Sequence, residues 1–449
     1  MPTTDASQRL AAFRQEVYRR ILGQRQDSLF EIIDALLTAD GPATLARLSQ
    51  APSVRRRWPS FPNALAAGTL DQPALTRLLT RTLAAPAPGE RPVWALDGTV
   101  WPRPQAHTSP ERTYGRTPLA AGRPNAVLRP SWEYQWLVAL PEVGGSWVLP
   151  LDVRRRSPNA PAPTVLAIDQ LRAVLASQPP AAPRPVVTCD SGYCPTTLAR
   201  AQLPVACLVR LARRRTLFRP PRAYRGRGRP PIHGPLFRTH DPTTQGVPDR
   251  EAAGPDPRHG TITIRVWHHL HARGGQDAPW TLVCIQAARL PRRGRRPAPL
   301  WLAWVGGPLP DDLLDLWRWY ARRFTIEHGF RFIKQELGWT TVRLRDPAAA
   351  DRWTWLVALT LWQLWLARIL VTDRRLPWER PLPTDRLTPG RVRRTVPGLY
   401  LQFGTPVPPP QPRGNAPGRR PGQAPGPHPR CPVVRRHPPR PRKPRRRAA

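Results

Sequence analysis

Residues 320–334 read YARRFTIEHGFRFIK, and this stretch is the most informative in the chain. Its polar landmarks are Tyr320, Arg323, Glu327 and Lys334. At about 100° per residue, an α-helix places all four within a stripe roughly 60° wide. We therefore predict one long helix over residues 311–337 that carries a carboxylate flanked by cations. On spacing alone, a surface helix with an ordinary Arg323–Glu327 ion pair explains the pattern equally well.

Two aspartates upstream of this stretch follow short apolar runs. Asp97 comes directly after residues 93–96, and Asp190 comes directly after residues 185–189. Both runs are predicted to be β-strands, and sites are usually built at the strand ends of an α/β sheet. Taken singly, a carboxylate at such a position is also often a turn residue or a helix cap.

Together, the three carboxylates suit phosphodiester chemistry. Cleavage and strand transfer need an activated attacking oxygen and a stabilised leaving oxygen, which two Mg²⁺ ions about 3.5–4 Å apart can provide. Mg²⁺ prefers carboxylate oxygens and completes its shell with water and phosphate. Asp97, Asp190 and Glu327 are therefore our candidate catalytic and metal-binding residues. The expected cofactor is a pair of Mg²⁺ ions, with Mn²⁺ as a substitute, and the nearby Arg323 and Lys334 would hold DNA phosphates.

These motifs resemble those of the DDE transposases of bacterial insertion sequences. The resemblance is to the branch with a Y-(2)-R-(3)-E-(6)-K signature, which here is residues 320–334. The first-Asp motif reads LDGT at residues 96–99, and the second reads CDSGY at residues 189–193. The TSPER run at residues 108–112 and the GRGRP run at residues 226–230 are also similar to such proteins. The resemblance covers about residues 10–375.

The resemblance implies a ribonuclease-H-like α/β catalytic fold with a β-rich insertion between the second Asp and the Glu. It implies Mg²⁺-dependent cleavage at terminal inverted repeats and strand transfer into target DNA. Tyr320, Arg323 and Lys334 would bind DNA. The partners would be double-stranded DNA, as element ends and as target, and a second copy of the chain on that DNA. Relatives can excise through a hairpin intermediate in which a Trp stacks on a flipped base, for which Trp301 and Trp304 are candidates.

Composition divides the chain into three parts. Residues 1–90 show apolar residues at helical steps and predict a helical N-terminal domain that binds DNA ends. Its basic cluster at residues 55–57 is equally compatible with a solvated surface of an ordinary helical domain. Residues 91–375 alternate strand-like and helical patterns, which predicts the catalytic domain, with its insertion at about residues 213–299. Residues 376–449 are rich in Pro and Arg and predict a disordered basic tail.

The formal net charge of +40 favours a polyanionic partner, with nucleic acid ahead of an anionic membrane surface. A GC-rich genome would explain the choice of Arg over Lys, but not the excess of 70 basic over 30 acidic residues. Five irregularly spaced Cys predict a reducing compartment, and residues 1–20 lack the apolar core of a signal peptide. The apolar run at residues 353–371 contains Gln363 and Arg368, so we predict a buried core helix rather than a membrane span. We expect a cytoplasmic, nucleoid-associated bacterial protein with no membrane partner.

Other ligand sites are not expected. The histidines at residues 268, 269 and 271 have no Cys pair or carboxylate at ligand spacing, and no glycine-rich phosphate loop follows a strand. Two alternatives to an active transposase stay open: an inactive DNA-binding relic or regulator, and a nuclease of the same fold that does not join strands. Inverted repeats and a short target duplication around the gene would distinguish them.

Overall fold

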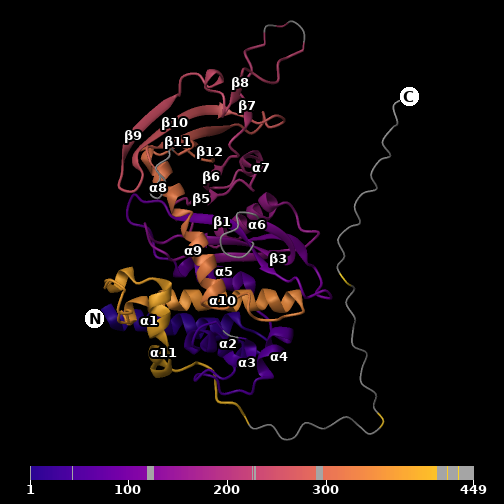
Figure 1. Cartoon of the computed structure of the whole chain (residues 1–449), viewed down its shortest axis with the longest axis vertical. Helices are drawn as coiled ribbons and strands as arrows, with labels where there is room; N and C mark the ends of the chain where they lie inside the picture. Colours follow the sequence, from indigo (N-terminus) through magenta and orange to yellow (C-terminus); the bar gives the residue numbers. More distant parts are fainter. Residues whose placement is uncertain are drawn as a thin grey trace.

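The computed structural model of the chain describes residues 2–42, 44–118, 126–224, 226, 229–289, 297–411, 422 and 433. Figure 1 shows a large mixed sheet above a layer of helices, with α8 and α9 running down from the sheet toward the long helix α10. The α/β class predicted from the sequence is confirmed.

A ten-stranded mixed sheet forms the centre of the protein, in the order β2-β3-β1-β5-β6-β12-β11-β10-β9, with β4 also paired to β3. Strands β1, β5 and β6 are parallel, and the other pairings are antiparallel. The strands are β1 (Val93–Pro102), β2 (Thr113–Pro118), β3 (Ala126–Ala139), β4 (Leu149–Arg156), β5 (Val186–Cys189), β6 (Ala206–Arg210), β9 (Arg250–Asp256), β10 (Gly260–Leu270), β11 (Trp280–Ala287) and β12 (Leu300–Val305). A separate two-stranded sheet pairs β7 (Thr216–Phe218) with β8 (Leu236–Arg238).

The predicted β-rich insertion does contain strands: β7 and β8 form the separate sheet, and β9, β10 and β11 extend the large one. Strand β12 pairs with β6 on one side and with β11 on the other, so β9–β12 continue the sheet past the parallel strands. The helices α6 (Pro163–Leu175) and α7 (Pro195–Arg200) provide the connections that parallel strands require. Within β1 and β5, Leu96 is the register partner of Cys189, so Asp97 and Asp190 come next on two adjacent strands.

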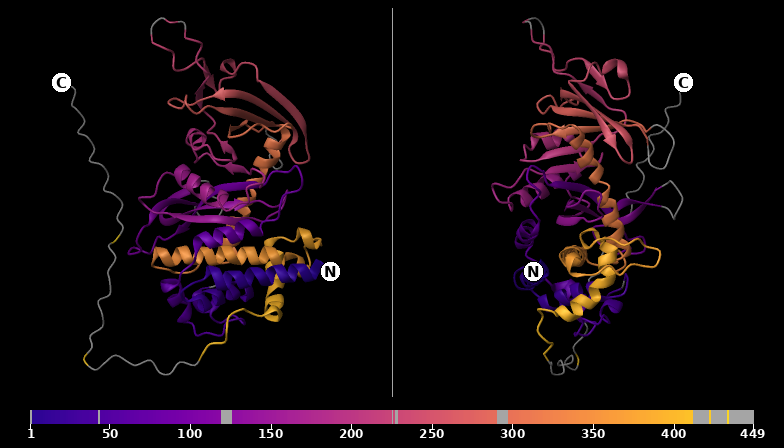
Figure 2. Two further views of the ribbon diagram at one scale, coloured as in Figure 1. Left: turned by 180° about the vertical axis from the view of Figure 1, so that it is seen from behind. Right: turned by 90° about the vertical axis from the view of Figure 1, so that its left-hand side faces the viewer.

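Helices from both ends of the chain form the layer beneath the sheet, in which α2 packs against α10 and α11. Both views in Figure 2 show this layer under the strands. The helices are α1 (Pro2–Glu16), which continues through η1 (Val17–Ile21), α2 (Gln26–Thr38), α3 (Leu45–Leu48), α4 (Ser60–Ala67), α5 (Gln72–Thr82), α10 (Pro347–Ala367) and α11 (Pro389–Phe403). Short 3₁₀ turns are η2 (Pro242–Thr244), η3 (Arg368–Leu370) and η4 (Thr384–Arg386).

The helix α10 is the core helix that the apolar run predicts. Among the described residues, the segment Pro347–Leu370 is the one helix long and apolar enough to cross a membrane, and 72% of its apolar window is buried inside the protein. Its polar groups find partners there: Gln363 accepts a hydrogen bond from Arg14 at 2.6 Å, and the indole N–H of Trp362 donates to the carbonyl of Pro150 at 2.7 Å.

The prediction of a disordered tail from residue 376 is wrong for α11. This helix buries Val392, Val396 and Tyr400, which recur every four residues and form one apolar stripe. The buried Arg393 donates to the carbonyls of Leu36, Ala39 and Gly41. A composition rich in Pro and Arg hid this short amphipathic repeat. Residues 412–449, apart from 422 and 433, lie outside the described residues.

The single helix predicted over residues 311–337 is in fact two, α8 (Leu314–Arg322) and α9 (Thr325–Gln335). The backbone keeps helical dihedral angles at Arg323 and Phe324. However, the N–H groups of Arg323, Ile326 and Glu327 donate to carbonyls three residues back, as in a 3₁₀ turn. This tight turn separates Tyr320 and Arg323 from Glu327 and Lys334, so the four do not share one regular helix.

Candidate active site

Two carboxylates lie side by side because β1 and β5 are parallel and adjacent, and their pairing ends at Leu96 and Cys189. Asp190 follows the end of β5, whereas Asp97 lies within β1, which continues to Pro102, so the prediction that Asp97 ends its strand is wrong. The side chain of Asp97 is 18% exposed, and its Oδ1 accepts a hydrogen bond from the N–H of Gly98 at 2.8 Å. Burial raises the pKa of Asp97 to about 6; the Arg323 guanidinium acts in the opposite direction, and the nearby Asp190 carboxylate adds to the rise. The Oδ1 of Asp190 accepts from the N–H of Gly192 at 2.9 Å, which fixes the turn after β5.

The guanidinium of Arg323 lies between Asp97 and Glu327. Its Nη1 is 3.0 Å from the Oδ2 of Asp97, and its Nη2 is 3.8 Å from the Oε1 of Glu327. Arg323 is only 5% exposed, whereas the side chain of Glu327 is 60% exposed. The structure thus brings Asp97 and Asp190 together and places Glu327 across one guanidinium from Asp97.

The three carboxylates fit Mg²⁺ in their chemistry, because this ion prefers carboxylate oxygens. The buried carboxylate of Asp97 would also be stabilised by an added positive charge. The three do not form a closed cluster, since no three His, Cys, Asp or Glu side chains in the described ranges are grouped closely enough to hold a metal ion. Arg323 supplies the positive charge between Asp97 and Glu327 instead. A divalent ion shared by these two carboxylates would therefore require the guanidinium to move.

Lys334 points at the first-Asp motif. Its Nζ donates to the Oγ1 of Thr99 at 2.6 Å and lies 5.8 Å from the centre of the Trp339 ring. Burial lowers the pKa of Lys334 to about 8. Thr99 escaped the sequence reasoning as a site residue, although residues two apart on a strand share a face and Asp97 was already a candidate.

The three residues predicted to bind DNA are not freely exposed in this conformation. Tyr320 and Arg323 are buried, and Lys334 is half-buried. The ring of Tyr320 lies 6.0 Å from the Arg323 guanidinium, so it helps to wall in that cation. Their predicted role in DNA binding stays a prediction.

Trp301 and Trp304, the candidates for stacking on a flipped base, cannot do so in this structure without unpacking the sheet. Both are buried. Trp301 lies 5.8 Å from Trp267 between ring centres, and Trp304 stacks on Trp319 at 6.1 Å. The two residues lie on opposite faces of β12, and both faces of this strand are covered. The sequence, in which Trp is abundant, did not reveal that these two are buried.

The TSPER run at residues 108–112 has a structural role. Arg112 is buried and donates to the carbonyls of Arg103, His107 and Ser109, which ties the loop after β1 to itself. The hydroxyl of Ser109 donates to the carbonyl of Arg345 at 2.8 Å. This loop therefore links the end of β1 to the connection between α9 and α10.

The basic cluster at residues 55–57 is also engaged in structure. Arg56 pairs with Asp27 and Glu31, at 2.7 Å in both cases, and Arg55 donates to the carbonyl of Val407 at 2.6 Å. These contacts hold the segment after α11 against the N-terminal helices. Two of the three arginines are therefore committed to internal contacts.

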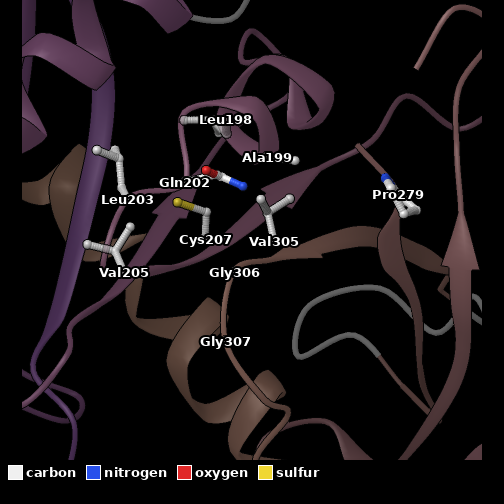
Figure 3. Close-up of a pocket in the computed structure, with 10 residues that line it drawn as sticks. All are labelled: Leu198, Ala199, Gln202, Leu203, Val205, Cys207, Pro279, Val305, Gly306 and Gly307. Atoms are coloured by element: carbon white, nitrogen blue, oxygen red, sulfur yellow. The ribbon is translucent and has the colours of Figure 1, made fainter. Parts of the chain in front are cut away.

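A cavity of about 320 Å³ lies elsewhere, among α7, β6 and β12 (Figure 3). It is lined mainly by small and apolar residues, among them Leu198, Val205 and Val305, and it includes none of the candidate residues. Cys207 lines it near the start of β6, whereas the carboxylates lie just beyond the last paired residues of β1 and β5, so the cavity lies toward the opposite end of the parallel strands.

Comparison with known proteins gives a matching family model and similar solved structures. A family model described as DDE superfamily endonuclease matches residues 17–273, which is more than half of the chain and includes Asp97 and Asp190. No curated protein matches the chain. The cryo-EM structure of a piggyBac transposase synaptic complex with hairpin DNA is similar with 8% identity and a TM-score of 0.42, over 88% of this chain and 76% of that one.

Proposed function

The chain belongs to the DDE superfamily of endonucleases, and on that basis we propose that it is a DNA transposase of a bacterial insertion sequence. It would cleave at terminal inverted repeats and join the ends to target DNA, in the branch with the Y-(2)-R-(3)-E-(6)-K signature. The observation that carries the proposal is the placement of Asp97 and Asp190 side by side where the parallel pairing of β1 with β5 ends, with Glu327 tied to Asp97 through Arg323.

The proposed fold of the catalytic part is ribonuclease-H-like. The strand order β4-β3-β1-β5-β6, with β3 antiparallel and β1, β5 and β6 parallel, supports it. In this arrangement two of the acids follow the last paired residues of β1 and β5, Asp97 within β1 and Asp190 just after β5. The third comes from a helix that follows the last strand of the extended sheet.

Asp97, Asp190 and Glu327 would hold two Mg²⁺ ions, or Mn²⁺ in their place. Such ions activate the attacking oxygen and stabilise the leaving oxygen of the phosphodiester. Arg323 would leave Asp97 when the ligands close, and its guanidinium would then be available to a DNA phosphate. Lys334, whose Nζ donates to Thr99, would place a compact cation on the strand that carries the first aspartate, two residues beyond it. Tyr320 would keep Arg323 in position from behind.

The partners follow from charge and reaction. A net charge of +40 supports binding of double-stranded DNA, both as element ends and as target. Joining two ends to one target is most simply done by a homodimer on DNA. The same assignment places the protein in the bacterial cytoplasm at the nucleoid, without a membrane partner.

The test uses the purified full chain and DNA duplexes that end in the inverted repeats flanking its own gene, with Mg²⁺. Asp97→Asn, Asp190→Asn and Glu327→Gln should each slow cleavage by roughly 100-fold or more, because several kcal/mol of charge stabilisation are lost. Binding of the duplex should be largely retained. Asp169→Asn on the exposed face of α6 is the control and should cleave normally.

Product mapping distinguishes the remaining functions. Joined products support a transposase, whereas cut ends without joining would indicate a nuclease of the same fold. Binding without any cut by the unaltered chain would indicate an inactive DNA-binding relic or regulator. Full Mg²⁺-dependent cleavage by one of the three variants would remove that residue from the site.

A further inference from the structure

Of the 18 Trp in the chain, two have at least half of their surface exposed: Trp58 at 50% and Trp378 at 79%. An exposed indole is costly to leave in water, and a protein usually hides it in a core or an interface. Trp378 lies in the connection between α10 and α11, which loops out from the helical layer (Figure 2, right). It is therefore the most accessible aromatic surface among the tryptophans.

Trp378 is presented by a closed turn. The N–H of Glu379 donates to the carbonyl of Leu376 at 2.9 Å, so residues 376–379 form a β-turn with Pro377 and Trp378 at its tip. Pro377 fixes one backbone angle of that tip. The Oε2 of Glu379 accepts from the N–H of Leu376 at 2.8 Å and closes the turn a second time.

The turn is anchored to α11 by ion pairs. Arg394 donates to both carboxylate oxygens of Glu379, at 2.7 and 2.9 Å, and Arg391 donates to Asp373 at 2.7 Å. The hydrogen bonds from Arg394 and from the N–H of Leu376 lower the pKa of Glu379 to about 2, so the anchor stays ionised at neutral pH. A loop held in this way loses little conformational entropy when it binds a partner.

The surface around the indole is cationic. Arg374, Arg375 and Arg380 are exposed beside it. Of the three acids of the connection, Asp373 and Glu379 are already paired with arginines of α11, and Asp385 lies farther along, in η4. The turn therefore offers a flat apolar ring flanked by guanidinium groups. This combination matches a nucleobase and its neighbouring phosphates, since aromatic stacking and backbone charge are what bind single strands without sequence preference.

We propose that residues 374–380, the Trp378 turn, form a DNA contact site in which the indole stacks on an unpaired or terminal base and the three arginines contact phosphates. This inference rests on the proposed action on DNA, but it concerns binding and is independent of the cleavage chemistry. An anionic membrane surface and a second copy of this chain are the competing occupants.

The first measurement compares binding of a fluorescently labelled single strand and of the corresponding blunt duplex by anisotropy. It is made at raised salt, where the phosphate contacts of a strongly basic chain are weakened. Trp378→Ala should weaken single-strand binding roughly tenfold, whereas Trp378→Phe should retain most of it because a ring remains. Trp58→Ala is the matched control and should bind like the unaltered chain.

The salt dependence separates stacking from charge. A variant carrying Arg374→Gln, Arg375→Gln and Arg380→Gln should lower the salt slope of single-strand binding by about 2, at about 0.7 for each phosphate contact. Trp378→Ala should lower the affinity and leave that slope unchanged. Identical binding of both probes by Trp378→Ala and by the unaltered chain would overturn the proposal.

A second measurement reads the site directly. In protein labelled with 5-fluorotryptophan, the ¹⁹F signal missing from Trp378→Phe belongs to Trp378, and it should shift when the single strand is added. A silent signal overturns the proposal. The proposal is also overturned if Trp378→Ala loses self-association, or binding to anionic vesicles, while its DNA binding is unchanged. Neither measurement reads cleavage. A failure of the catalytic proposal would be seen separately, as full cleavage by the Asp97, Asp190 or Glu327 variants.

Discussion

Asp97→Asn should stabilise the metal-free protein at neutral and alkaline pH, although it removes a residue that we place in the active site. The reason is the burial of the carboxylate in the middle of β1, where its side chain is only 18% exposed. Burial raises the pKa of Asp97 from 3.8 to about 6 even with Arg323 at 3.0 Å. The folded chain therefore holds an ionised group that would be better solvated in the unfolded chain.

The size of the effect follows from the shift. A rise of about 2 units corresponds to about 3 kcal/mol, at about 1.4 kcal/mol for each unit. Because the folded pKa is the higher one, the native state binds the proton more tightly, and the stability from this group is fully present below pH 3.8. It is lost as the pH rises through about 6. The advantage of Asp97→Asn should thus be near zero at the acid end and grow to about 3 kcal/mol above pH 7.

The assay is urea unfolding with a chelator present, at a series of pH values, for the unaltered chain, Asp97→Asn and the surface control Asp169→Asn. Adding Mg²⁺ should then stabilise the unaltered chain more than Asp97→Asn, because a ligand that binds only the native state raises its stability. A lower stability of Asp97→Asn at pH 8 would refute the reasoning. It would mean that the loss of the ion pair with the buried Arg323 outweighs the cost of burying the carboxylate.

Three further predictions concern the supports of the site. The chain has two Lys, so lysine-labelled NMR should show one ammonium that titrates near pH 8, that of Lys334, and the signal should be lost in Lys334→Arg. Gly329→Ala should lower the free energy of unfolding by about 1–3 kcal/mol and slow cleavage, because its Cβ would lie 2.2 Å from Val148 and push α9 off the sheet. Gly390→Ala, with open space around it, is the control for thermal melting. Arg393→Ala should lower the free energy of unfolding by about 2–4 kcal/mol, because the carbonyls of Leu36, Ala39 and Gly41 lose their donor. An unchanged midpoint in chemical denaturation would show that α11 does not stabilise the helical layer.

The sequence was most informative where a short local pattern determines the structure. The apolar run before Asp190 predicts a strand that ends there, and β5 is that strand. The run before Asp97 also lies in a strand, but the prediction that the strand ends there is wrong, because β1 continues to Pro102 through its pairing with β3. The apolar stretch around Trp353 and Gln363 predicts a buried helix, and α10 is that helix. Such patterns work because alternation and helical periodicity depend only on residues close together in the chain.

The sequence misled where composition or periodicity was taken as uniform. The Pro- and Arg-rich stretch beyond residue 376 hid α11, whose buried stripe of Val392, Val396 and Tyr400 matters only because α2 and α10 cover it. The regular helix drawn through Tyr320 and Lys334 ignored the tight turn after Arg323. In both cases, contacts made far along the chain decide the local geometry.

By itself, the sequence determined that Asp97 lies in a strand, that Asp190 follows one and that Glu327 lies on a helix, and that a strongly basic chain would carry them. Only the tertiary structure decided what lies between them. Arg323 reaches Asp97 across 226 positions of sequence and fills the space that a shared ion would need. The physical reason is that a buried charge takes the counter-charge that packing brings within reach, and packing of a helix against a distant strand end cannot be read from spacing along the chain.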